Sequence, residues 1–206
     1  MGNRSHKPVV NFRPRSQQAT ELIDKSLRRT VLVALLTAGL SLSAFAADWP
    51  QWRHDARRSG ATEENLPSDL KPMWTLQLGM PAPAYRHQYR MCADITYAPV
   101  AAEGMLFVPS NVEDQVMAFD LATGHLRWRF FTEGPVRFAP VYHRGKLYFT
   151  SDDGYLYCVT AADGFANWKV RGVPKRVPVS PMLVNGRVVS RWPARGAPTC
   201  TSTIGR

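Results

Sequence analysis

The stretch FDLATGHLRW (119–128) decides the fold of this 206-residue chain, because its pattern returns further along. It combines an apolar beginning, a Thr-Gly pair and a single tryptophan between two arginines. Later the chain reads CVTAADGFANW (158–168), and both stretches place a glycine four residues before a tryptophan. A glycine and a tryptophan that return together after 40 residues indicate an internal repeat.

A longer alignment of the chain with itself supports this repeat. The segment TYAPVAAEGMLFVPS (96–110) matches RFAPVYHRGKLYFTS (137–151) at a spacing of 41 residues. They share an Ala-Pro-Val beginning, a glycine, a leucine and a final serine. A third beginning, VSPMLVNGRVV (179–189), follows after another 41 residues, with Pro181 and Gly186 in register. The three registers predict three copies of one unit.

Each unit is predicted to be a four-stranded antiparallel meander. Short apolar or alternating runs are separated by glycine turns, and no window keeps apolar side chains at helical spacing. Proline at the first strand is tolerated there because its missing N–H falls outside the ladder. The predicted turns are Glu103-Gly104, Arg144-Gly145, Asn185-Gly186, Asp152-Asp153-Gly154 and Ala162-Asp163-Gly164.

Such a sheet cannot bury both faces alone, so copies are expected to stack around an axis as the blades of a β-propeller. We therefore predict an all-β fold with about three blades, an incomplete set because closed propellers typically use about four to eight. Trp74, Trp128 and Trp168 are predicted to fill the gaps between neighbouring blades. The repeated tryptophan thereby receives a packing role.

Residues 1–46 are predicted to be a signal peptide that precedes the propeller. Seven basic residues precede the uncharged run 31–46, which ends in the small-x-small triplet Ala44-Phe45-Ala46. A retained hydrophobic helix that anchors the chain in the inner membrane is the alternative, although 16 residues are short for a bilayer that needs roughly 20. Membrane contact is expected only through residues 31–46, if they are uncleaved, and the rest is expected in the periplasm or outside the cell.

Charge and cysteine content exclude some classes of function. The net charge of +10 falls to about +5 after residue 46, and no dense basic run remains, so nucleic-acid binding is not expected. Cys92, Cys158 and Cys200 follow no metal-binding spacing. In an oxidising compartment one pair of them can bridge and leave the third free. A small buried residue is the plainer interpretation of Cys158, which lies in an apolar run.

The motif from Ala118 to Trp128 resembles the repeat of quinoprotein-type β-propellers, the pyrroloquinoline-quinone (PQQ) repeat family. That family includes the propeller lipoprotein of the outer-membrane barrel-assembly machinery. The segment 47–67 is similar to the start of exported bacterial propellers of this group, and the likeness covers residues 47–198. We divide the chain after the leader into a propeller lead-in (47–80), an inserted loop (81–95), the repeats (96–198) and an irregular tail (199–206).

The resemblance implies no assignable catalytic site. Enzymes of this family hold PQQ on the propeller axis with a metal ion, an aspartate base and a ring of adjacent cysteines, and no two cysteines are adjacent here. We predict no catalytic residue and no metal ligand, leave cofactor-binding residues unassigned, and expect no cofactor, since PQQ is suggested only by the resemblance. Asp152-Asp153-Gly154 is interpreted as a hairpin turn rather than a calcium loop. The other residues considered and not assigned are Asp94, Asp114, His54 and His87.

The sequence favours a non-catalytic exported propeller that acts as a binding scaffold in the cell envelope. The expected partner is another protein or further propeller blades, and the inserted loop 81–95 is the first candidate surface. The alternative is a fragment of a PQQ-dependent dehydrogenase. A second alternative is a non-functional truncated product, because TCTSTIGR (199–206) departs from the repeat as a frameshift would make it do.

Overall fold

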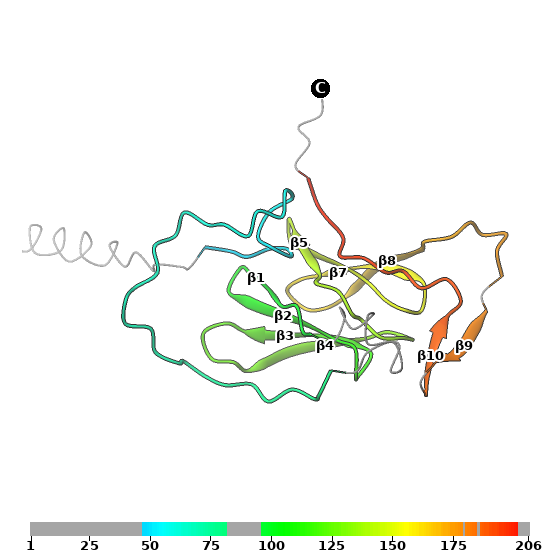
Figure 1. Cartoon of the computed structure of the whole chain (residues 1–206), viewed down its shortest axis with the longest axis horizontal. Coiled ribbons are helices and arrows are strands. Elements are labelled where there is room, and N and C mark those ends of the chain that lie inside the picture. Colours follow the sequence, from blue (N-terminus) through cyan, green and yellow to red (C-terminus); the bar gives the residue numbers. More distant parts are fainter. Residues whose placement is uncertain (1–46, 82–95, 179, 185, 202–206) are drawn as a thin grey trace, which may run out of the picture. The chain divides into compact units, whose positions relative to one another are not determined.

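The computed structural model describes residues 47–81, 96–178, 180–184 and 186–201. In these ranges every regular element is a strand, which confirms the all-β prediction (Figure 1). No helix there is long and apolar enough to cross a bilayer. The predicted leader 1–46 and nearly all of the predicted inserted loop 81–95 lie outside the described residues. The strands are β1 (Val100–Ala102), β2 (Met105–Ser110), β3 (Gln115–Asp120), β4 (Leu126–Phe131), β5 (Val141–His143), β6 (Lys146–Thr150), β7 (Tyr155–Thr160), β8 (Ala166–Arg171), β9 (Pro181–Val184) and β10 (Arg187–Ser190).

Two four-stranded antiparallel meanders form, in the orders β1-β2-β3-β4 and β5-β6-β7-β8. Their first hairpins turn where the sequence predicts. Glu103 and Gly104 have φ of 49° and 72°, and Arg144 and Gly145 have φ of 47° and 73°. Positive φ at both central residues matches the twist of a two-residue hairpin, so these turns set the register of each sheet.

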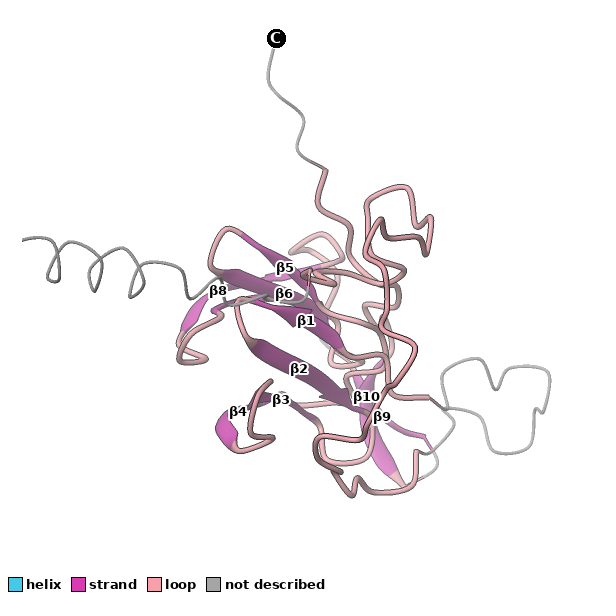
Figure 2. Cartoon of the chain, turned by 90° about the vertical axis from the view of Figure 1, so that its left-hand side faces the viewer, coloured by secondary structure: helices cyan, strands magenta, loops and turns pink. Residues whose placement is uncertain are grey.

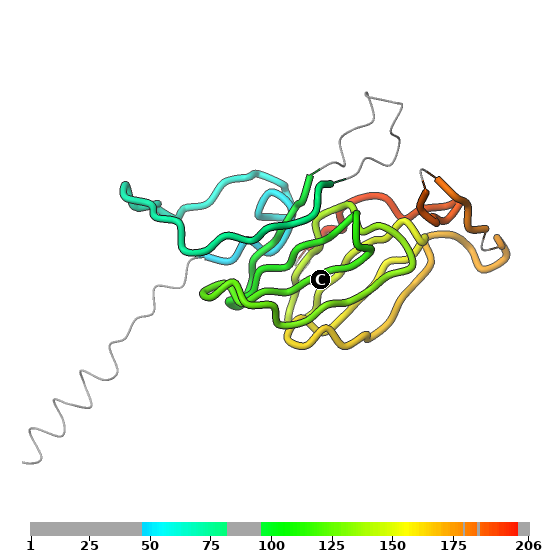
Figure 3. The backbone as a smooth tube through the Cα atoms, turned by 90° about the horizontal axis from the view of Figure 1, so that it is seen from below, coloured from blue at the N-terminus to red at the C-terminus, as the bar shows by residue number. Residues whose placement is uncertain are grey.

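The two sheets bury their common core between facing side chains. Figures 2 and 3 show the strands of one sheet running beside those of the other. Phe107, Leu147 and Phe149 are fully buried in this layer. The Phe149 ring stacks on Tyr157 at 5.4 Å, and Phe130 from the first sheet meets both rings edge-on. Close-packed aromatic pairs of this kind hold neighbouring blades together.

A tryptophan of one unit packs on the turn glycine of the next unit. Trp128 is only 9% exposed, and its indole Nε1 donates a hydrogen bond to the Ala161 carbonyl at 2.9 Å. A Cβ on Gly164 would lie 2.8 Å from the Trp128 ring. Burial of about 200 Å² of indole contributes roughly 5 kcal/mol before entropy is subtracted. The glycine and the tryptophan therefore recur together because each glycine receives the preceding unit's indole.

The same contact occurs one unit earlier but not one unit later. Trp74 packs on Gly124, and its Nε1 donates to the Leu121 carbonyl at 2.9 Å. Trp168, by contrast, remains 47% exposed and lies beside Tyr148 at 5.9 Å between ring centroids. The prediction of a gap-filling role is confirmed for Trp74 and Trp128. Trp168 fills no such gap, because the described residues supply no further turn for it.

The hairpin predicted from Pro181 and Gly186 forms, but as a separate two-stranded sheet of β9 and β10. The first strands of the two meanders, β1 and β5, approach each other, but within the described residues neither β9 nor β10 approaches a strand of the second sheet in this way. The hairpin instead lies beyond the strand ends, where Ser190 N donates to the Asp152 carbonyl at 2.7 Å (Figure 1). Its expected role as the opening of a third stacked unit is therefore wrong, because a proline, a glycine turn and apolar residues describe any hairpin.

Hydrogen bonds identify a different segment as the third unit's beginning. Val136 N donates to the Ser110 carbonyl at 3.2 Å, and Ala194 N donates to the carbonyl of Ser151, its repeat equivalent, at the same distance. The residues that follow are Arg-Phe-Ala-Pro after Val136 and Arg-Gly-Ala-Pro after Ala194. Residues 194–198 thus take the place of 136–140 at a spacing of 58, and the hairpin is an insertion before them.

Asp120 closes the turn that carries Gly124. Its Oδ1 accepts hydrogen bonds from the backbone N and the hydroxyl of Thr123, both at 2.9 Å. Its Oδ2 accepts from Arg127 Nη2 at 2.6 Å. The hydrogen bond from Arg127, followed by those from Thr123, lowers the pKa of Asp120 to about 2. In the second unit Thr160 replaces this aspartate, and the turn persists because Gly164 N still donates to the Thr160 carbonyl.

The first prediction concerns the contact between the Trp128 ring and Gly164. Replacing Gly164 by alanine is expected to cost roughly 2–5 kcal/mol of unfolding free energy, from a left-handed alanine and a clash with Trp128. Gly145→Ala is the matched control, because its φ of 73° is nearly the same and its Cβ would meet nothing within 4 Å. Its cost is expected to be roughly 1–2 kcal/mol. Equal losses in urea denaturation would show that the indole contact does not depend on a bare glycine.

The second prediction concerns the Asp120 turn. The carboxyl is expected to titrate near pH 2 in the folded chain and closer to 3.8 in the Arg127→Gln variant, as followed by NMR. Since the folded pKa lies below the unfolded one, the turn's contribution to stability is present above pH 3.8 and is lost as pH falls toward 2. A titration midpoint unchanged by the substitution would contradict the assigned cause.

Candidate functional site

The meander brings several connections to the same end of both sheets. In an antiparallel meander the β2–β3 turn and the connection after β4 lie at the same end of the strands. Here these are the turns 111–114 and 151–154 and the connection 132–140, with the β9–β10 hairpin lying against them. We call these four segments the loop face. It is the first candidate region for function because loops on a rigid sheet scaffold commonly carry binding and catalytic residues.

A buried carboxylate occupies the centre of the loop face. Asp152 is 1% exposed, and its Oδ2 accepts a hydrogen bond from Arg137 Nε at 2.6 Å. Arg195 donates to both oxygens, at 3.1 Å from Nε and 3.0 Å from Nη2. Arg137 and Arg195 occupy equivalent places in the second and third units. One carboxylate therefore joins the beginnings of two consecutive units.

The neighbouring Asp153 belongs to the turn itself. Its Oδ1 accepts from the Tyr155 backbone N at 3.0 Å, and its Oδ2 accepts from the Tyr157 hydroxyl at 2.5 Å. Burial, and secondly this carboxylate, raise the pKa of Tyr157 far above its usual value. Gly154 completes the turn with φ of 94°. The interpretation of Asp152-Asp153-Gly154 as a hairpin turn is confirmed.

The inserted hairpin is held on the loop face by Arg187. Its Nη1 donates to the Val112 carbonyl at 2.6 Å, and its Nη2 pairs with Asp114. Burial raises the pKa of Asp114, and the Arg187 hydrogen bond opposes that shift. Gln115, only 1% exposed, donates to Glu113, whereas its Oε1 is buried without a hydrogen-bond partner in the described structure. The polar side chains of this region therefore interact with other residues of the same chain.

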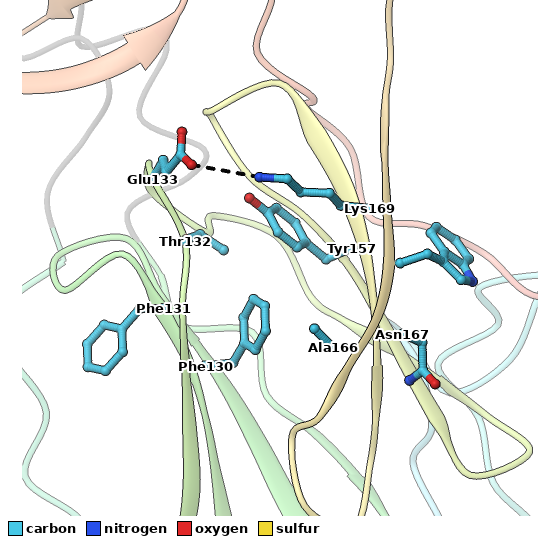
Figure 4. A pocket seen from close by; sticks show the side chains of 9 residues that line it. Phe130, Phe131, Thr132, Glu133, Tyr157, Ala166, Asn167 and Lys169 are labelled. Atoms are coloured by element: carbon cyan, nitrogen blue, oxygen red, sulfur yellow. Dashed lines mark ion pairs between the residues drawn. The ribbon is translucent and has the colours of Figure 1, made fainter.

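A groove of about 410 Å³ opens between the outer strands β4 and β8 (Figure 4). Phe130 and the Tyr157 ring form an aromatic wall. At one end Lys169 Nζ lies 3.7 Å from a Glu133 carboxylate oxygen and 4.5 Å from the Tyr155 ring centroid. The groove can therefore accept an apolar group beside a polar, charged one. Its remaining lining residues are Phe131, Thr132, Ala166, Asn167 and Trp168.

A second cavity, of about 510 Å³, lies near the lead-in segment. His54 is one of its lining residues, and its ring lies 4.9 Å from Trp49. The other lining residues are Asp48, Pro50, Gln51, Asp55, Ala56, Arg57 and Cys200. Across the described ranges, no three histidine, cysteine or acidic side chains gather to hold a metal ion.

Of the residues considered from sequence, the structure brings Asp114, Asp152 and Asp153 to the loop face. His54 lies apart from them in the second cavity. Asp94, His87 and Cys92 lie outside the described residues. Sequence reasoning missed the arginines 137, 187 and 195, although the shared Arg-x-Ala-Pro pattern before residues 141 and 199 pointed to two of them.

The family model described as outer membrane protein assembly factor BamB matches residues 42–193. A search of curated proteins finds no match. Among solved structures, quinohemoprotein alcohol dehydrogenase from Comamonas testosteroni is 18% identical with a TM-score of 0.45, covering 72% of this chain and 23% of that one.

Two further solved structures have lower TM-scores. BamB from Moraxella catarrhalis is 17% identical with a TM-score of 0.33, covering 45% of this chain and 30% of that one. Quinohemoprotein alcohol dehydrogenase ADHIIG from Pseudomonas putida HK5 is 22% identical with a TM-score of 0.35, covering 44% and 16%. This chain therefore spans less than a third of each of these structures.

The buried carboxylate generates the third prediction. Asp152→Asn is expected to lower the unfolding free energy by about 3–5 kcal/mol, because it leaves the buried Arg137 guanidinium without its counter-charge. Asp163→Asn, an exposed turn residue whose side-chain oxygen can still accept from Phe165 N, is the control and is expected to change stability by about 0.5 kcal/mol or less. Similar losses in both variants, measured by urea denaturation, would contradict a structural role for the Asp152 charge.

Proposed function

Because this chain belongs to the PQQ-repeat β-propeller family of the outer membrane protein assembly factor BamB, we propose that it is an exported propeller segment that acts by binding another protein. The proposed location is the cell envelope, where the named assembly factor of the family works. The predicted leader 1–46 agrees with export. In this proposal the repeats form a rigid support, and their exposed surface binds the partner protein.

The observation that carries the proposal is the groove between β4 and β8, together with exposed apolar side chains on these two strands. Phe131, at the end of β4, is 66% exposed, and Trp168 and Val170 on β8 are about half exposed. Phe131 lines the groove. Trp168 and Val170 share with Cys158 the face of the second sheet that is turned away from the first sheet. Exposed apolar side chains with polar residues at their border are typical of protein-binding surfaces. Lys169 and Glu133 provide that border at one end of the groove (Figure 4).

The chain's own residues do not fit the PQQ site that the family resemblance implies. No two of its cysteines are adjacent, so the disulfide ring of that site cannot form. Asp152 is the most buried aspartate of the loop face, yet both its oxygens accept hydrogen bonds from guanidinium groups. A carboxylate engaged in this way is poorly placed to take a proton from a substrate. These features favour binding over oxidation as the proposed function.

The fourth prediction tests the groove as a binding surface. The full chain is expressed in its own cells with a photo-crosslinking amino acid in place of Phe131, and a second version carries it in place of Leu66, which is 73% exposed and lies outside the groove. A discrete crosslinked protein is expected from position 131 and not from position 66. Equal crosslinking at both positions, or none, would contradict the proposal.

The enzymatic alternative has its own readout. Purified full chain is mixed with PQQ and Ca²⁺, and dye reduction is followed with a primary alcohol as substrate. No reduction is expected above that of the cofactor alone. Turnover of the alcohol would overturn the non-catalytic proposal and favour a segment of a quinoprotein dehydrogenase.

A further inference from the structure

The contact layer between the first two sheets contains a small residue covered by the next unit. Phe107 on β2 pairs in register with Ala118 on β3. From the second unit, the ring of Tyr142 on β5 stacks on Phe107 at 6.4 Å with an interplanar angle of 9°. All three side chains pack in the same core cluster. A residue at the Tyr142 place therefore covers the Phe107–Ala118 pair of the preceding sheet.

Both partners of this layer have equivalents one unit later. Tyr148 on β6 takes the place of Phe107 and pairs in register with Cys158 on β7, which takes the place of Ala118. Residues 194–198 take the place of 136–140 at a spacing of 58, and the same spacing carries Tyr142 to Cys200. The repeat geometry thus sets Cys200 over the face on which Tyr148 and Cys158 lie.

Contacts of the C-terminal segment agree with this placement. The Thr150 hydroxyl, two residues along β6 from Tyr148 and on the same face, donates to the Gly196 carbonyl at 2.9 Å. Arg58 Nη2 donates to the Ala197 carbonyl and to the Thr199 hydroxyl, both at 3.2 Å. The segment is therefore held across this face immediately before Cys200.

The burial of Cys158 supports the same arrangement. Its neighbours Tyr157 and Val159 point into the core shared with the first sheet, so Cys158 points to the opposite face. No complete third sheet covers that face in the described residues, and Trp168, on the adjacent strand, is 47% exposed. Cys158 is nevertheless only 2% exposed. The C-terminal segment, which carries Cys200, lies over this face.

We propose that Cys158 and Cys200 form a disulfide that fastens the beginning of the third unit to the second sheet. Both cysteines are free thiols in this structure, so the proposed bond belongs to an oxidised form. Cys92 is left as the unpaired third cysteine. The bond would join the second sheet to the segment that covers it, much as inter-sheet disulfides join facing sheets in other β-proteins. In the cell the proposal rests on the exported location given above, because oxidising compartments preserve disulfides.

The chemistry is a thiol–disulfide exchange with a disulfide donor as the oxidant. The thiolate of the half-buried Cys200 attacks the donor, whose S–S bond breaks and releases one thiol. The Cys158 thiolate then attacks the mixed disulfide and releases the second thiol. The two cysteines lose two protons and two electrons in total, and the donor gains them.

Burial raises the pKa of both thiols, and interaction with the Tyr148 hydroxyl partly opposes the shift at Cys158. Since only thiolates attack, the exchange is expected to be slow at neutral pH and faster at about pH 8.5. The mild alkaline condition therefore suits the experiment.

The fifth prediction tests the bond directly. The folded full-length chain is incubated with oxidised glutathione, its remaining thiols are alkylated, and it is digested with trypsin without reductant. Peptides 147–169 and 196–206 contain Cys158 and Cys200, respectively. They are expected as the main linked pair, with a mass two hydrogens below the sum of the two. The Cys92→Ser variant is expected to retain this pair, and Cys158→Ser and Cys200→Ser to lose it.

Denatured chain provides the control for the native geometry. In guanidinium chloride all three pairings of Cys92, Cys158 and Cys200 are accessible, and a mixture is expected. A folded chain that yields the same mixture, a pair containing Cys92, or free thiols only would overturn the proposal. This readout requires neither a partner protein nor a particular cellular location. Its failure would therefore leave the binding function of the groove between β4 and β8 unaffected.

Discussion

The contact of an indole with a bare glycine in the next unit is the constraint on which this structure depends. Trp128 can lie flat over the turn at Gly164 only because no Cβ stands there, and it adds a hydrogen bond to the Ala161 carbonyl. Trp74 and Gly124 repeat the arrangement. The turn glycine has two roles, since it also adopts a positive φ that other residues avoid. The missing Cβ of this glycine is therefore needed both for the stacking of the sheets and for the conformation of the turn.

The loop face is organised by charge, in contrast to the apolar layer between the sheets. Asp152 is buried with guanidinium groups from the second and third units, so its ion pairs connect these two units, whereas the hydrophobic layer connects the first two. Arg187 similarly fastens the inserted hairpin to the first unit. Removing one member of a buried pair leaves the other charge unsolvated, which makes these contacts specific as well as stabilising. Phe131 and Trp168 remain exposed on the outer strands, where we propose that a partner protein binds.

Sequence reasoning recovered the local features and lost the long-range ones. Alternating apolar residues and turn glycines gave the two meanders and their hairpins, because strand period and positive φ are local properties. The interpretation of Pro181 and Gly186 failed because local hairpin pattern does not say which sheet a hairpin joins. Arg137 and Arg195 were not recognised as partners of Asp152, since the ion pairs join segments 15 and 43 residues apart. Only stacking of the units brings them together.

The direction of the tryptophan contact sets an order on the folding of the chain. Each sheet packs its tryptophan on the unit that follows. This side chain therefore remains uncovered until the glycine turn of the next unit has been synthesised. Gly164 follows Trp128 at a spacing of 36 residues, which a ribosome adds in about 2–7 s at about 5–20 residues per second. During that interval each nascent blade presents an uncovered aromatic surface. The repeat therefore also has a direction during synthesis, because the most recently made blade is the one with an uncovered aromatic surface.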